Sequence, residues 1–246
     1  HLVAKYMKTV ENIQMVFTLS GGHIESILDG FTEYNIKTID VRHEQAAAMM
    51  AHAWSIYTGE TGVCLVTAGP GFTNSLTGIV NAYLDNVPLV VLCGRHPLRD
   101  DLTGALQEMN QIDMIKPVTK WNATCYETKR LPEYLSIAFR QATMGRPGPA
   151  FLELPPDILF KEVDEDKLAI PHRRIHKSSV HPEKPDLQEA ARLINHAQRP
   201  LFLGGSGIGM SDCQNELKTF IEKTGVPFAL RSKICRPGRG TPRCPR

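Results

Sequence analysis

Two short apolar runs constrain the fold of this chain more than any other feature of its sequence. Gly62–Thr67 (GVCLVT) and Pro88–Cys93 (PLVVLC) are almost wholly apolar, and a segment of helical period separates them. Such runs are typical of strands that are buried on both faces, and these strands occur in parallel sheets covered by helices. The sequence therefore predicts an α/β fold with a parallel sheet flanked by helices.

The same alternation of strands and helices continues along most of the chain. Further strands are expected at Gln14–Leu19, Lys37–Val41 and Ala150–Leu154, and helices at Ile24–Tyr34, Glu44–Tyr57, Asn74–Leu84 and Leu131–Met144. A second series is expected as helix Leu187–His196, strand Pro200–Leu203, helix Cys213–Thr224 and strand Val226–Leu230. We therefore expect a complete domain over residues 1–157, a charged linker over 158–186 and an incomplete second domain over 187–230.

Composition excludes several classes of protein. The 246 residues are 42% hydrophobic and 22% charged, which suits a soluble globular protein. No apolar run is long enough to span a bilayer, so no membrane partner is expected. The six cysteines lack the spacing of a metal site, and two of them lie in apolar runs, which favours a cytoplasmic location.

Residues 231–246 depart from the rest of the pattern. They hold six of the basic residues and no acidic residue, so that residues 1–230 have a net charge of −4 against +2 for the whole chain. A basic tail can bind nucleic acid. This one has no aromatic residue and no helical period, so we predict no nucleic-acid partner and interpret the tail as the product of truncation or a frame error.

Three expected strands each end in residues that can carry chemistry. Ser20–His23 contains two glycines and a histidine, Glu44 begins a predicted helix, and Thr67–Asn74 (TAGPGFTN) is rich in glycine. Each has a plain structural alternative: a histidine bonded to backbone, an acid favoured by the helix dipole, and a tight turn. Because the carboxyl ends of parallel strands meet at one edge of a sheet, the three together indicate a ligand site. Gln107, in a polar loop, is a further candidate for binding a substrate oxygen.

In these motifs the chain resembles the acetolactate synthase-like, thiamine-diphosphate-dependent enzymes. The similarity runs in order through Arg42–Ala47 (RHEQAA), Thr67–Asn74, Asn81–Val90 (NAYLDNVPLV), Leu106–Glu108 and Gly148–Asp157 (GPAFLELPPD). It implies a flavodoxin-like, pyrimidine-binding N-terminal domain. A turn at Gly204–Gly207 resembles the beginning of the middle domain of that family.

The resemblance also implies roles for individual residues. Glu44 corresponds to the glutamate that hydrogen-bonds the aminopyrimidine of thiamine diphosphate and activates this cofactor. Cofactor contacts are implied for Gly22, Thr67, Pro70 and Asn74. His23 and Gln107 would act on the substrate, which favours a carbon–carbon bond lyase or carboligase for 2-keto or 2-hydroxy carbonyl compounds over acetolactate synthase proper.

One expected motif of the family does not occur in this sequence. The diphosphate and Mg²⁺ are bound in the family by a Gly-Asp-Gly segment of a C-terminal domain, and no Gly-Asp-Gly is present here. We therefore expect this chain to be inactive alone, and a homodimer or homotetramer in the full-length protein. An inactive fragment and a flavodoxin-like nucleotide-binding module are the alternatives, and a role for FAD is left open.

Overall fold

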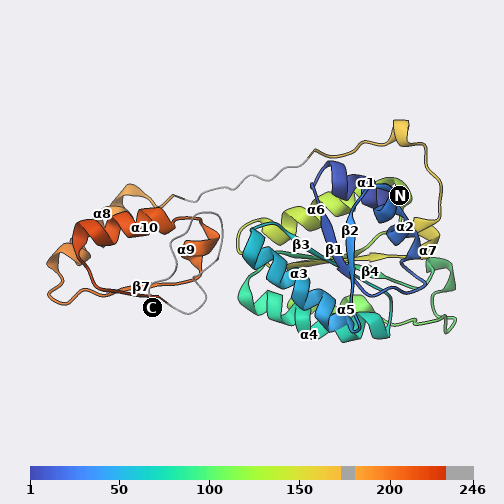
Figure 1. Cartoon of the computed structure of the whole chain (residues 1–246), viewed down its shortest axis with the longest axis horizontal. Helices are drawn as coiled ribbons and strands as arrows, with labels where there is room; N and C mark the ends of the chain where they lie inside the picture. The colour runs from blue at the N-terminus through green and yellow to red at the C-terminus, as the bar shows by residue number, and fades with distance from the viewer. Residues whose placement is uncertain (173–180, 231–246) are drawn as a thin grey trace. The chain divides into compact units, whose positions relative to one another are not determined.

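The computed structural model describes residues 1–172 and 181–230 (Figure 1). The chain divides into two compact units, His1–His176 and Lys177–Arg246, which are treated separately below. The division between them falls within residues 158–186. The basic tail over 231–246 lies outside the described residues.

The first unit is built on a six-stranded sheet with the order β2-β1-β3-β4-β6-β5, and every pairing is parallel. The strands are β1 (Met15–Thr18), β2 (Lys37–Asp40), β3 (Gly62–Val66), β4 (Leu89–Gly94), β5 (Trp121–Thr124) and β6 (Pro149–Leu154). This confirms the predicted fold class. The direction of winding reverses between β1 and β3, and ligands bind at such a reversal in open α/β sheets.

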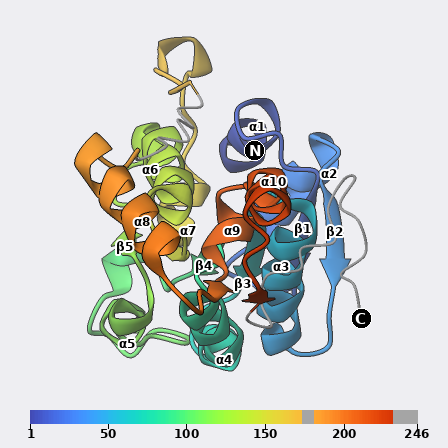
Figure 2. The ribbon, with the colours of Figure 1, turned by 90° about the vertical axis from the view of Figure 1, so that its left-hand side faces the viewer.

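Helices cover both faces of this sheet (Figures 1 and 2). One face is covered by α1 (Leu2–Thr9), α2 (Glu25–Glu33) and α6 (Leu131–Thr143), and the other by α3 (Glu44–Thr58), α4 (Pro70–Asp85) and α5 (Gln111–Ile115). Strand β3 shows why its sequence is continuously apolar. Val63 and Leu65 pack into the first core, whereas Cys64 and Val66 pack into the second.

The remaining regular segments of this unit are short. Helix α7 (Pro156–Leu159) follows β6, and single 3-10 turns lie at Leu98–Asp100, Lys116–Val118, Thr128–Arg130 and Glu165–Lys167. The structure adds α1, α5 and β5 to the predicted elements. Strand β5 has the sequence WNAT and lies at the edge of the sheet, where it lacks the apolar run that marks a buried strand.

Helix α4 begins at Pro70, four residues before its predicted first residue. Gly69 is its N-cap, with φ +59°, and Pro70 occupies the first turn. Proline suits this position because the first N–H groups of a helix have no intrahelical acceptor. The Gly-Pro-Gly segment, which precedes the predicted helix, therefore lies largely in the first turn of the observed one.

The second unit contains α8 (Lys184–His196), β7 (Phe202–Gly204), α9 (Gly207–Met210), α10 (Gln214–Thr224) and β8 (Phe228–Leu230). Strands β7 and β8 pair in parallel. Among its described residues Val226 is the one buried hydrophobic side chain, while Leu193, Leu203 and Phe228 are exposed. These elements thus enclose little core. In neither unit does a described helix combine the length and apolarity needed to cross a membrane.

Candidate functional site

Glu44 is a buried carboxylate at the carboxyl edge of the sheet. It is the first residue of α3, after the end of β2, and only 7% of it is exposed. Its Oε2 accepts a hydrogen bond of 2.9 Å from Nδ2 of Asn74, in the second turn of α4. His43 caps α3, because its Nδ1 accepts the N–H of Gln45 at 3.2 Å. The positive end of α3 favours an anion at this position.

Thr67 lies between this carboxylate and His23. Its Oγ1 is 3.2 Å from Nδ1 of His23. A Cβ on Gly71 would lie 2.6 Å from Cγ2 of Thr67 and 3.3 Å from Oε1 of Glu44, and a Cβ on Gly21 would lie 2.6 Å from Cβ of Thr67. Glycine at both positions therefore leaves the space that the threonine occupies. Three of the predicted site residues from three strand ends come together here.

A cavity of about 340 Å³ opens beside Thr67, and Glu44 is not among the residues that line it. It is lined by Gly21, Gly22, His23, Thr67, Pro97, Leu106, Gln107 and Pro156. Gln107 has φ +59°, and its Oε1 is buried with no hydrogen-bond partner among the described residues. A Cβ on Gly22 would meet no atom within 4 Å. The cavity is therefore lined mainly by apolar and small residues, with His23, Thr67 and Gln107 as its polar members, which suits a small organic ligand.

The predicted site residues thus divide into two groups that Thr67 joins. Glu44 and Asn74 form the carboxylate pair, and Pro70 is the first residue of α4, one turn before Asn74. Gly22, His23 and Gln107 line the cavity, whereas the carboxylate pair does not. The sequence predicted that the three strand-end segments with His23, Glu44 and Thr67 meet at one edge, and the structure places them at the ends of β1, β2 and β3, which are neighbours in the sheet, while Gln107 comes from the loop after β4.

Partial burial of His23 lowers the pKa of its imidazole below 6.5, and the nearby His96 acts in the same direction. The folded state then binds this proton less readily than the unfolded chain does. The resulting contribution to stability is present above the unfolded pKa of about 6.5 and is lost as the pH falls through the folded pKa. His23 is accordingly neutral at pH 7.

We predict that an NMR titration of the His23 ring gives a midpoint below 6.5, for the reason just stated. The His23→Gln variant identifies the resonance by its loss. A midpoint for His23 at or above 6.5 would contradict the burial of this ring.

The loop that carries Gln107 is tied down by Glu108. Its carboxylate accepts backbone N–H groups of Leu102, Gly104 (2.8 Å) and Ala105 (3.0 Å), and these bonds lower the pKa of Glu108. They close the loop on itself, and so they hold the residue that precedes Glu108 at the cavity wall.

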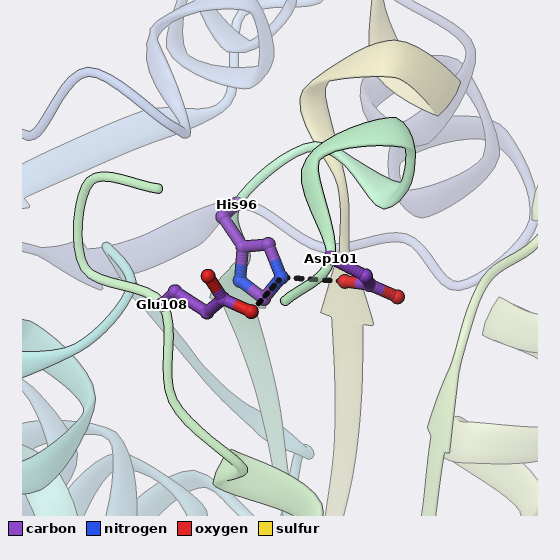
Figure 3. A group of neighbouring side chains, drawn as sticks. All are labelled: His96, Asp101 and Glu108. Carbon is purple, nitrogen blue, oxygen red and sulfur yellow. Dashed lines mark hydrogen bonds and ion pairs between the residues drawn. The ribbon is translucent and has the colours of Figure 1, made fainter. Parts of the chain in front are cut away.

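Glu108, His96 and Asp101 are the one group of possible metal ligands among the described residues (Figure 3). Asp101 Oδ1 is 2.6 Å from Nε2 of His96 and 2.8 Å from Nη2 of Arg95. The oxygens of Glu108 already accept hydrogen bonds from backbone amides, so a cation would compete with these donors for them. The positively charged guanidinium of Arg95, bonded to Asp101, would also repel a cation. We interpret the group as an ion-pair network that orders the loop.

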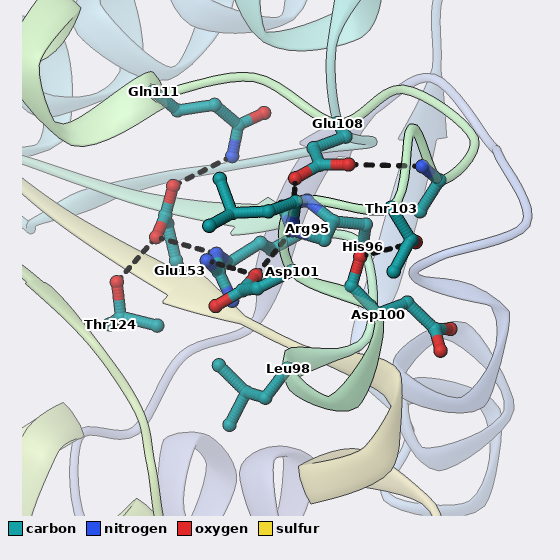
Figure 4. A network of polar contacts seen from close by, with 12 residues as sticks. Arg95, His96, Leu98, Asp100, Asp101, Thr103, Glu108, Gln111, Thr124 and Glu153 are labelled. Atoms are coloured by element: carbon teal, nitrogen blue, oxygen red, sulfur yellow. Dashed lines mark hydrogen bonds and ion pairs between the residues drawn. The ribbon is translucent and has the colours of Figure 1, made fainter.

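Two buried polar residues next to the site escaped the sequence analysis. Gln111 and Glu153 are each 1% exposed, and Nε2 of Gln111 donates to Oε1 of Glu153 at 2.9 Å (Figure 4). Gln111 resembles any polar loop residue in the sequence. Glu153 could have been noticed, because an acid in the otherwise apolar run Ala150–Leu154 requires a buried partner.

The fold and the site together define a parallel α/β domain with a buried carboxylate at its carboxyl edge. Residues 1–114 match the family model described as "Thiamine pyrophosphate enzyme, N-terminal TPP binding domain". Residues 187–233 match the one described as "Thiamine pyrophosphate enzyme, central domain". The chain belongs to the thiamine pyrophosphate enzyme family, as its motifs predicted.

Curated relatives of this chain carry the name acetolactate synthase. A probable acetolactate synthase large subunit of Methanocaldococcus jannaschii is 35% identical over 92% of this chain and 39% of the relative. The acetolactate synthase large subunit of Buchnera aphidicola subsp. Schizaphis graminum is 37% identical over 88% of this chain and 38% of the relative. The chloroplastic acetolactate synthase of Arabidopsis thaliana is 33% identical over 89% and 33%. This chain thus spans about two fifths or less of the length of these relatives.

Proposed function

We propose that this chain supplies the pyrimidine-binding half of a thiamine diphosphate site, with Glu44 as the activating carboxylate. The buried pair of Glu44 and Asn74 carries the proposal. Asn74 holds Oε2 at 2.9 Å, while Oε1 accepts a hydrogen bond from no described residue. A carboxylate oriented through one oxygen leaves the other to accept or share a proton with a ring nitrogen.

The residues present fit the cofactor in two respects. Glu44 provides an oriented acceptor, and His23 and Gln107 line the neighbouring cavity. When bound, thiamine diphosphate supplies a reactive thiazolium carbon and stores the electrons of a broken carbon–carbon bond. Glu44 would hold the proton at the aminopyrimidine, and Pro70 and Thr67 would contact this ring.

His23 and Gln107 support a lyase or carboligase that acts on 2-keto or 2-hydroxy carbonyl compounds. Both line the cavity, and the lowered pKa of His23 leaves a neutral imidazole that can exchange a proton with a hydroxyl group. Acetolactate synthase is the second candidate, because relatives at 35% and 37% identity carry that name. The products formed from pyruvate alone and from pyruvate with an aldehyde would separate the two.

The proposal places the diphosphate and Mg²⁺ on a different domain. The one candidate ligand group among the described residues, around His96, is already occupied by Arg95 and by backbone amides. In this arrangement the pyrimidine half and the diphosphate half face each other across a dimer or a tetramer. The chain by itself would then bind the cofactor weakly and turn over no substrate.

Isothermal titration with thiamine diphosphate and Mg²⁺ tests this proposal. We expect no micromolar binding to the chain alone. We expect binding by a chimera in which residues 1–230 precede the remaining part of the Methanocaldococcus jannaschii relative. Micromolar binding by the chain alone would contradict the half-site, whereas a folded chimera that does not bind would contradict the cofactor assignment.

A further inference from the structure

Gln111 is a buried amide whose hydrogen-bonding capacity is fully used. Its Oε1 accepts the N–H of Gly69 at 2.9 Å, and its Nε2 donates to the carbonyl of Gly94 at 3.0 Å and to Oε1 of Glu153 at 2.9 Å. Both hydrogens of the side-chain amide are thus engaged. A flipped amide would place its oxygen against two acceptors and its nitrogen against a donor, so one orientation is fixed.

Glu153 anchors this amide to the sheet. It lies on β6, is 1% exposed, and also accepts the hydroxyl of Thr124 on β5. Nε of Arg95 lies 3.6 Å from its Oε2, and Arg95 bonds in turn to Asp101 (Figure 4). A buried carboxylate is stable only with such partners, and its charge strengthens the bond from Gln111.

Gly69 is the residue through which Gln111 reaches the site. Its φ of +59° and the following proline set the direction in which α4 leaves β3. Pro70 has no N–H to donate. The N–H of Gly69 is the donor that ties this turn to Gln111, which lies outside the turn. Asn74, five residues later on the same helix, holds Glu44 at 2.9 Å. A displacement of about 1 Å at such a contact has large functional effects.

We propose that Gln111, held by Glu153, is a positioning residue that sets the turn at Gly69 and thereby the contact of Asn74 with Glu44. It joins the carboxyl ends of β3, β4 and β6 through Gly69, Gly94 and Glu153. It touches neither Glu44 nor the cavity. The importance of the contact it sets rests on the proposed function, but the contact itself can be measured without cofactor.

The test uses NMR on the whole chain and compares wild type with Gln111→Glu. This variant keeps the size of the side chain but sets a carboxylate against Glu153 and the carbonyl of Gly94. We expect the hydrogen-exchange protection of the Gly69 amide to fall roughly tenfold or more. We also expect the side-chain amide shift of Asn74 to change. The amide of Ile27, in the core of α2, should keep its protection relative to global unfolding.

Two further variants separate positioning from general destabilisation. Ile27→Val should lower the protection of all core amides together and leave the shift of Asn74 in place. Adding Glu153→Gln to Gln111→Glu restores a donor between these two positions and should recover part of the protection of Gly69. If Gln111→Glu fails to fold, Gln111→Met replaces it. Methionine has a side chain of about the same length without the polar atoms, and the same changes at Gly69 and Asn74 are expected.

An unchanged Gly69 amide in a folded Gln111 variant would overturn the proposal, and so would an altered Gly69 with an unchanged Asn74. None of these measurements depends on thiamine diphosphate. A wild-type chimera that fails to bind the cofactor would therefore count against the proposed function alone.

Discussion

Replacing Glu44 with glutamine is expected to slow proton exchange at the thiazolium C2 of bound thiamine diphosphate by about 100-fold or more. Glutamine keeps the size of the side chain, and its oxygen can still accept the hydrogen bond from Asn74 that Oε2 of Glu44 accepts at 2.9 Å. It cannot take or share a proton. The change therefore removes the acid–base function of the residue and preserves its packing at the start of α3.

Proton exchange would be measured by NMR after mixing with deuterium oxide, in the chimera with the Methanocaldococcus jannaschii relative. Asn74→Ala is the matched control. It leaves the carboxylate but frees its rotation, so that exchange should slow by less than in Glu44→Gln. Cofactor binding by both variants must first be shown by titration. Exchange at the wild-type rate in a cofactor-bound Glu44→Gln protein would refute the activating role.

The strands and helices that the sequence identified correctly are those in which local pattern and burial agree. Val63 and Leu65 face one core and Cys64 and Val66 the other, so β3 is apolar at every position and needs no context to be recognised. Strand β5 is different. Its identity depends on pairing with β6, whose register brings Trp121 beside Ala150, and such a non-local pairing leaves no trace in four residues of mixed polarity.

In the candidate site, too, some features follow from local sequence and others depend on non-local contacts. Thr67 follows β3 directly, and Glu44 and His23 come within five residues of the ends of β2 and β1, so parallel topology alone predicts that they gather at one edge. The separation of the carboxylate pair from the cavity depends on Thr67 filling the space beside Gly71, which is a matter of side-chain packing. Gln111 lies 42 residues from both Gly69 and Glu153 in the sequence, and no local pattern connects them.

The largest effect on stability is expected for Gly62→Ala, at the first residue of β3. A Cβ there would lie 2.0 Å from the carbonyl oxygen and 2.7 Å from the carbonyl carbon of Ala51, and 2.9 Å from Oγ of Ser55. Because the first two are backbone atoms of α3, no side-chain rotation relieves the overlap. Ser55 cannot move away without breaking two hydrogen bonds. Its Oγ accepts the N–H of Gly62 and donates to the carbonyl of Pro88, both at 2.6 Å.

Overpacking of a core costs about 1–3 kcal/mol and occasionally more, and we expect Gly62→Ala to lower the free energy of unfolding by about 3 kcal/mol or more. That is a large share of the 5–15 kcal/mol typical of a domain. Gly22→Ala is the control, because a Cβ there meets no atom within 4 Å, and its effect should stay within about 0.5 kcal/mol. Urea unfolding of both variants measures the difference. Equal midpoints would show that α3 can move away from β3, and Glu44, the first residue of that helix, would then have no fixed place against Asn74.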